Sequence, residues 1–136
     1  MREPREVVRE WVQAIDHCDA DRAASLYHEA ATNLQVAIGV PAVGRQAIQE
    51  ELQTFFTAFP DGETQLENLF QDGPWAMAEW RGRGTWSGEF AGLPANGKTF
   101  EIEGCGFFHI VDGKIKFQRG YWDRASFFEQ LGIPEV

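Results

Sequence analysis

Apolar residues recur at helical spacing in the first part of the chain. Between Arg5 and His17 they follow one another at steps of one, three and four residues, after a proline at position 4. This spacing places them on one face of an amphipathic helix. A second, shorter helix, capped by Asp19 or Asp21, is expected to bury Ala23, Leu26 and Tyr27.

The pattern then changes to alternation. From Ala31 to Ile38 the polar residues Asn33 and Gln35 alternate with apolar ones, which predicts a strand. The alternation leaves open whether the two amides face the interior or the solvent. A third helix is expected from about Arg45, with apolar positions at helical spacing until the proline at position 60 stops it.

The second half is typical of an antiparallel sheet, because four apolar or alternating runs follow one another with turn signals between them. The Asp-Gly pair at residues 112–113 is the strongest of these signals, since it favours the type I′ hairpin turn. A last helix from Arg124 to Leu131 is expected to end at Gly132. The strands are expected at Thr64–Gln71, Trp75–Trp86, Lys98–Val111 and Lys114–Asp123.

Helices first and a long sheet second indicate an α+β fold, in which the N-terminal helices cover a curved antiparallel sheet and close it into a cone. The chain has 136 residues, 43% of them hydrophobic, so residues 1–136 are expected to form a single domain. The 11 Phe, 5 Trp and 2 Tyr are many for this length. Some of them are candidates to line a cavity between the sheet and the helices.

Charge and hydropathy exclude several classes of partner. The formal charge of −9 repels a phosphate backbone, so nucleic acid is not expected as a partner. No apolar stretch has the length of a membrane span or of a signal peptide, so no membrane contact is expected. Cys18 and Cys105 are expected to be reduced, buried thiols. These features together indicate a cytoplasmic protein.

Motifs of cofactor and metal chemistry are missing from the sequence. The glycines at positions 82 and 84 lack the third glycine of a dinucleotide-binding turn, and neither a Walker loop nor a nucleophilic serine motif is found. His17, His28 and His109 do not lie at metal-ligand spacing. We therefore expect no cofactor and no metal, and we look for acid/base chemistry by isolated side chains.

Residues 84–98, with the sequence GTWSGEFAGLPANGK, closely resemble the GTHxGxxxGxxPTGK segment of the SnoaL-like polyketide cyclases, with Trp86 in place of the family's histidine. The turn at 112–115, the pair Trp122 and Asp123, and the QLG tail at 130–132 resemble the closing hairpin and tail of the same family. The helical first third is similar to the wider nuclear transport factor 2-like and ketosteroid isomerase-like superfamily. The resemblance implies a cone with the ligand inside it, and a homodimer, expected here through the sheet face.

The resemblance also implies a role for Asp123, near the end of the last strand, as general acid/base in an intramolecular aldol closure. Apolar neighbours such as Trp122 and Phe127 would suit a carboxylate to this work. The other interpretation is that Asp123 caps the last helix.

Two related enzyme classes have incomplete residue sets in this chain. The positions that resemble the tyrosine, the base and the acidic donor of the ketosteroid isomerases are Trp11, Gln35 and a place near Gly106. We therefore do not expect steroid isomerisation. The positions that resemble the limonene epoxide hydrolase set are Glu79, Arg81 and Gly120.

Glu79 and His109 are further catalytic candidates. Glu79 shares one side of its strand with Arg81 and Arg83, and this side faces either the solvent, as a ladder of charged pairs, or the pocket. His109 is the only histidine in the predicted sheet and would suit a proton shuttle. The candidate substrate-binding residues are Trp11, Ile15, Tyr27, Asn33, Gln35, Phe56, Trp80, Phe108, Gln118 and Trp122.

Three functions are compatible with these residues. The first is a cofactor-independent cyclase, isomerase or hydrolase in which Asn33, Gln35 and Gln118 orient a small apolar carbonyl compound. The second is a non-catalytic module that binds an apolar metabolite or a protein partner. The third is a scaffold whose cone is filled by its own tryptophan and phenylalanine side chains.

Overall fold

The computed structural model describes residues 2–134, which form four helices and six strands. In chain order these are α1 (Pro4–Asp16), α2 (Ala20–Ala24), β1 (Tyr27–Gln35), β2 (Ala42–Val43), α3 (Arg45–Ala58), β3 (Glu63–Asp72), β4 (Trp75–Thr85), β5 (Thr99–Val111), β6 (Lys114–Trp122) and α4 (Arg124–Leu131). The expected helices and the four expected strands of the second half are all present. The short strand β2 has no counterpart in the sequence pattern.

The six described strands form one sheet in the order β2-β1-β6-β5-β4-β3. Neighbouring strands are antiparallel except β1 and β6, which pair in parallel, so the sheet is mixed rather than wholly antiparallel. The β5–β6 hairpin turns at Asp112 and Gly113, whose φ angles of 51° and 75° are positive, as a type I′ turn requires.

The first strand differs from its prediction at both ends. Leu26 and Tyr27 do not lie on a helix, because α2 ends at Ala24 and Tyr27 is the first residue of β1. Asp19 is the residue that caps α2, since its side chain accepts a hydrogen bond from the Arg22 amide at 3.0 Å. The strand ends at Gln35, and Val36 and Ile38 after it are exposed.

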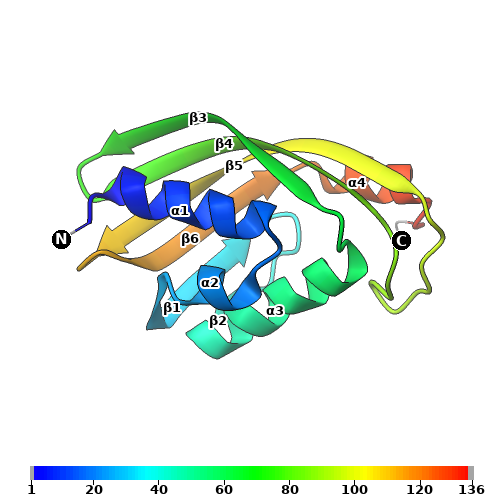
Figure 1. Cartoon of the computed structure of the whole chain (residues 1–136), viewed down its shortest axis with the longest axis horizontal. Coiled ribbons are helices and arrows are strands. Elements are labelled where there is room, and N and C mark those ends of the chain that lie inside the picture. The colour runs from blue at the N-terminus through cyan, green and yellow to red at the C-terminus, as the bar shows by residue number, and fades with distance from the viewer. Residues whose placement is uncertain (1, 135–136) are drawn as a thin grey trace.

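Helices α1, α2 and α3 gather inside the curve of the sheet, and α4 lies near the start of β5 (Figure 1). Helix α1 packs against β3, and α3 packs against β1. Alternate residues of β3 to β6 point toward these helices, and the others point to the convex side, which we call the outer face. Helices over one side of a curved sheet produce the expected cone.

Two apolar clusters fill the space under the sheet. One joins α1 and α3 to the sheet through residues such as Val8, Ile48 and Phe108. The other joins α4 to the end of α3 and the start of β5 through residues such as Phe59, Phe100 and Phe127. Trp11 belongs to the first cluster and Phe59 and Phe100 to the second, and all three line one cavity. The cavity thus lies at the junction of the two clusters.

Candidate ligand site in the cone

A cavity of about 110 Å³ lies between α1, α3 and the inner face of β4 and β5. Its wall is almost wholly apolar, which suits an apolar ligand. The residues that line it are Trp11, Ile15, Cys18, Phe55, Phe56, Phe59, Gly62, Glu63, Thr64, Trp80, Gly82, Arg83, Phe100 and Ile102. Four of these were predicted from the sequence as substrate-binding residues, namely Trp11, Ile15, Phe56 and Trp80.

Cys18 is the one thiol on the described wall of this cavity. Its Sγ lies 3.8 Å from the Gly62 carbonyl oxygen and 3.9 Å from that of Phe59. Burial raises the pKa of the Cys18 thiol, so the group stays protonated and is a poor nucleophile. Cys18 and Cys105 are both free and half-buried.

A hydrogen-bond chain runs from α1 across β1 to β6. The Trp11 indole Nε1 donates to the Tyr27 hydroxyl at 2.9 Å, and that hydroxyl donates to Oε1 of Gln118. Tyr27 is fully buried and Gln118 is 2% exposed. Burial raises the pKa of Tyr27 above its usual range, so the phenol keeps its proton and remains a donor.

A second chain joins β6 to β1. The Trp122 indole Nε1 donates to Oε1 of Gln35 at 3.0 Å, and Nε2 of Gln35 donates to Oδ1 of Asn33 at 2.8 Å. The side chain of Gln35 lies over Gly120, where a β-carbon would collide with its amide group. The gap at Gly120 is therefore occupied by Gln35.

The two chains have a fixed direction, because an indole N–H can only donate. Each chain starts at a tryptophan, and every side-chain amide in it accepts a hydrogen bond through its oxygen. The amide nitrogens of Gln118 and Asn33 are thus left at the two ends, and neither has a hydrogen-bond partner among the described residues. Asn33 and Gln118 are register partners in the β1–β6 pair. The structure therefore places these two amides at neighbouring positions of the inner face.

This arrangement answers the question of which way the β1 amides face. Asn33 is buried and Gln35 is half-buried, so both point into the cone. Two adjacent amide donors can hold a carbonyl oxygen and stabilise negative charge on it. The hydrogen-bond network itself contains no carboxylate and no imidazole.

The buried phenol gives a testable pH dependence. The unfolded chain releases the Tyr27 proton near pH 10, whereas the folded chain holds it to higher pH, so the free energy of unfolding should fall as pH rises above about 10. A Tyr27→Phe variant should lose about 1–2 kcal/mol at pH 7, because Trp11 and Gln118 lose their partner. Urea unfolding at pH 7 to 11 measures both effects. The same alkaline fall in the variant and the wild type would contradict the assignment.

Asp123 lies at the N-terminus of α4, where its Oδ1 accepts a hydrogen bond from the Ser126 amide at 3.1 Å. It is exposed, and it lines a shallow surface depression together with Trp122, Val36 and Ala37. The capping interpretation of this residue is therefore confirmed. The general acid/base role stays a prediction.

The cap gives a further test. Asp123→Ala should lower the free energy of unfolding by about 1 kcal/mol, while Asp123→Asn, which retains a capping side chain, should cost only a few tenths. Urea unfolding of the two variants measures the difference. Equal losses would show that the cap does not account for the effect.

Glu79 points to the outer face, so of its two possible orientations the one toward the pocket is wrong. It is exposed, and its Oε1 accepts a hydrogen bond from the Asn68 amide at 2.6 Å. The residues that alternate with it toward the helices, Ala78 and Trp80, occupy the inner face. Because side chains alternate along a strand, Glu79 cannot reach the cavity.

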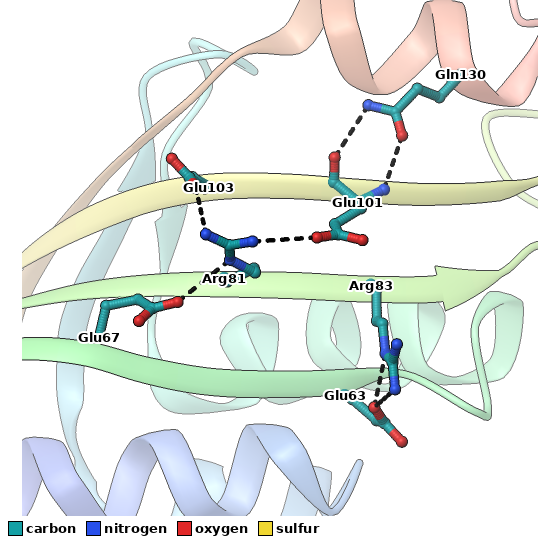
Figure 2. Close-up of polar contacts among 7 residues, drawn as sticks. All are labelled: Glu63, Glu67, Arg81, Arg83, Glu101, Glu103 and Gln130. Atoms are coloured by element: carbon teal, nitrogen blue, oxygen red, sulfur yellow. Dashed lines mark hydrogen bonds and ion pairs between the residues drawn. The ribbon is translucent and has the colours of Figure 1, made fainter.

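The other charged residues of β4 form a ladder on the same outer face (Figure 2). Arg81 lies 3.2 Å from Glu67, 3.3 Å from Glu101 and 2.8 Å from Glu103, and Arg83 lies 2.6 Å from Glu63. These ion pairs join three neighbouring strands across the exposed surface. The solvated interpretation of this side of the strand is therefore correct.

His109 and Phe108 also differ from their predicted roles. His109 lies on the outer face and stacks on Trp75, with ring centroids 4.8 Å apart and planes 13° from parallel. It does not reach the cone, so a proton shuttle there is excluded. Phe108 is fully buried and packs edge-on against Trp11 at 4.8 Å. It belongs to the apolar core and not to the cavity wall.

Several residues of the cavity wall are absent from the sequence-based set, among them Phe55, Phe59 and Phe100. A signal for the cavity exists in the glycines at alternate positions of β4 to β6, because a strand face without side chains leaves room for large neighbours. The inner-face glycines are Gly82, Gly84, Gly104, Gly106 and Gly120.

Comparison with solved structures identifies the fold as ketosteroid isomerase-like. A protein described as having this fold, from Catenulispora acidiphila DSM 44928, superposes with a TM-score of 0.80 at 19% identity, covering 98% of this chain and 96% of that one. A structure from Jannaschia Sp. CCS1, described as a SnoaL-like polyketide cyclase, superposes with a TM-score of 0.85 at 18% identity over 99% of both chains.

Sequence comparison identifies the family to which the chain belongs. Residues 5–131 match the SnoaL-like polyketide cyclases, and the chain belongs to this family. It is 30% identical to the aklanonic acid methyl ester cyclase DnrD of Streptomyces peucetius over 132 residues, which cover 95% of this chain and 90% of DnrD.

Two kinds of feature are missing from residues 2–134. Within this range no helix combines the length and hydropathy needed to cross a membrane. The same residues contain no cluster of three or more histidine, cysteine, aspartate or glutamate side chains that could hold a metal ion.

Proposed function

We propose that this protein is a cofactor-independent enzyme of the cyclase or isomerase type that acts on a small apolar carbonyl compound. The observation that carries the proposal is the pair of unpartnered amide nitrogens on Gln118 and Asn33 at the ends of two directed hydrogen-bond chains. Such donors bind a carbonyl oxygen more tightly as it gains negative charge, which is the charge change in enolate formation.

The proposed reaction is an intramolecular aldol closure. A base removes a proton from the carbon next to the held carbonyl, and the resulting enolate carbon attacks a second carbonyl carbon of the same molecule. A carbon–carbon bond forms, and the new alkoxide takes up a proton. We assign the proton transfers to Asp123, because it lines the surface depression with Trp122, whose indole holds Gln35 in the network. The reduced state of Cys18 and Cys105 favours a cytoplasmic location for this activity.

One observation favours a second candidate function. The amide network has no proton-transferring group, so a module that only binds an apolar carbonyl compound would need nothing more than is present. The two functions differ in whether the α-protons of the ligand exchange with solvent.

Proton exchange on a simple ketone tests the proposal. Acetophenone in D₂O should exchange its methyl protons faster with the protein than in buffer, as followed by ¹H NMR. Asp123→Asn, which keeps a helix cap, and Asn33→Leu should each reduce this acceleration, by loss of the base and of a donor respectively. Binding without faster exchange would favour the binding module, and the absence of any binding would reject both functions.

We propose that the partner at the outer face is a second copy of the chain. Phe70, Trp75 and Tyr121 are 56%, 37% and 41% exposed there, which is a large apolar area for the surface of a monomer. Arg119 lies among the rings of Phe107, Phe117 and Tyr121 with its Nε buried and without a hydrogen-bond partner in the described chain. A buried N–H group without an acceptor costs free energy, and an acceptor from a second copy would remove that cost.

Glu79 is the acceptor that a second copy offers. Glu79 on β4 and Arg119 on β6 flank β5, and neither makes an ion pair within residues 2–134. A two-fold axis near β5 brings each residue toward the other residue of the partner copy, as an isologous interface requires.

Charge reversal tests this pairing. Arg119→Glu alone should weaken the dimer by about tenfold or more, because two carboxylates then face each other. The double variant Arg119→Glu with Glu79→Arg should restore it. Sedimentation velocity over a concentration series measures the association. A wild type that stays monomeric at high concentration, or a double variant that is not rescued, would contradict the interface.

A further inference from the structure

The indole of Trp80, on the inner face of β4, packs directly against the sheet. The ring lies across two glycines, one on its own strand and one on β5: Cζ3 is 3.3 Å from where a β-carbon of Gly82 would stand, and Cζ2 is 2.5 Å from that of Gly104. Only a sheet without side chains at these two positions lets the ring lie so close to it. Gly82 and Gly104 therefore form a berth for the indole.

This berth lies between the cavity and the two amide donors. In the register of the sheet, Trp80 pairs with Gly104, and Gly104 pairs with Trp122. On one side of this row lie Gly82 and Ile102, which line the cavity. On the other side lies the Ala78, Gly106 and Gly120 row, over which Gln35 is placed, and beyond it the row that contains Gln118 and Asn33.

The residues that line the cavity are consistent with this order of rows along the sheet. Trp80 lines the cavity, whereas Asn33, Gln35, Gln118 and Trp122 do not. At about 110 Å³ the cavity is somewhat smaller than the 150 Å³ apolar cavity that holds benzene in an engineered protein. Its size thus matches about one aromatic ring, well below the roughly 300–1,000 Å³ of typical ligand pockets.

We infer that Trp80 is the specificity-determining partition of the site: the carbonyl group of a ligand in the cavity reaches Gln118 and Asn33 only when the indole leaves its berth. This inference rests on the proposed function, because it concerns access to the proposed amide donors. Displacing the ring costs free energy, so the partition lowers affinity for every ligand that uses the donors. It penalises ligands with several fused rings most, because they need the volume of the berth as well.

A matched pair of ligands isolates access to the donors. Acetophenone carries a carbonyl and ethylbenzene does not, while the two have nearly the same size. In Trp80→Ala, the affinity for acetophenone relative to ethylbenzene should rise by about tenfold over the wild-type ratio, as measured by titration calorimetry. Trp80→Phe, which keeps a ring and more of the packing, should give a smaller rise in the same direction and serves if the alanine variant does not fold.

Phe55→Ala is the control, because Phe55 also lines the cavity but belongs to α3 and packs against Phe59 and Phe90, away from the amide rows. It enlarges the cavity without opening the berth, so the ratio of the two affinities should stay within about twofold of wild type. An equal rise in the Trp80 and Phe55 variants, or no rise in either Trp80 variant, would overturn the inference.

The double variant Trp80→Ala with Asn33→Leu separates the two proposals. A ratio that rises in the single variant and collapses in the double variant supports both. A ratio that rises and then persists keeps the partition but rejects Asn33 as a donor. The wild type itself could prefer acetophenone. If Asn33→Leu removes that preference and Trp80→Ala leaves it unchanged, the donors are supported and the partition is rejected.

Discussion

Gly104→Ala adds one methyl group to the inner face of β5 and should be more destabilising than such an addition at any other position of that face. The free energy of unfolding should fall by about 3 kcal/mol. The new β-carbon would stand 2.7 Å from the Tyr121 carbonyl oxygen and 2.5 Å from the Trp80 ring. The ring could move, but the carbonyl is backbone of the neighbouring strand β6 and cannot. Urea unfolding at pH 7, followed by tryptophan fluorescence, measures the loss.

Gly106→Ala is the matched control for this variant. Gly106 lies two residues further along the same strand and faces the same side, yet its nearest neighbour would be the Phe108 ring at 3.2 Å. A small shift of that ring should keep the cost to about 1 kcal/mol, at the low end for overpacking. Equal losses at the two positions would show that the close approach of Tyr121 and Trp80 is not the cause.

Gln118→Leu should lower the rate of ketone proton exchange by about 100-fold, the effect of removing one donor to a developing oxyanion. The leucine has a similar volume but offers neither the N–H₂ donor nor the acceptor for the Tyr27 hydroxyl. The buried hydroxyl without an acceptor should also cost about 1–3 kcal/mol of stability. Exchange is measured by ¹H NMR with acetophenone, at a temperature where circular dichroism finds the variant fully folded.

The control for this variant is Gln130→Leu. Gln130 donates to the Glu101 carbonyl at 3.1 Å and accepts from its amide at 2.7 Å, so it ties α4 to β5 far from the amide donors (Figure 2). Its replacement should reduce stability and leave exchange per folded molecule unchanged. If Gln118→Leu retains wild-type exchange, Gln118 is not a donor in the reaction.

The sequence pattern predicts the helices and the second-half strands well, because each is a local feature. Periodic apolar positions fix α1 and α3, and the Asp112-Gly113 turn sets the hairpin of β5 and β6. The parallel pairing of β1 with β6 is a contact between distant segments. The strand pattern of each segment is the same whichever direction its partner runs, so alternation alone could not predict it.

Which face of a strand points inward is set by the same distant contacts. His109 was a candidate proton shuttle, but it pairs with Trp75 of β4 and Phe117 of β6 and lies outward, stacked on Trp75. Glu79 lies on β4, and the side chains on either face of this strand could face the interior or form pairs at the surface. The choice between its faces depends on Arg81 finding carboxylates on β3 and β5, which no single strand reveals.

The proposed donors and the cavity walls are carried by different parts of the chain. Asn33 and Gln118 lie on β1 and β6, whereas the cavity is lined from α1, α3, β3, β4 and β5. Trp11 is shared, because it lines the cavity and also begins the chain to Gln118. Substitutions at the other lining residues can reshape the space offered to a ligand without removing a member of either hydrogen-bond chain. In evolutionary terms, such a division lets descendants of one ancestor acquire new substrates by changing the walls while they inherit the chemistry unchanged.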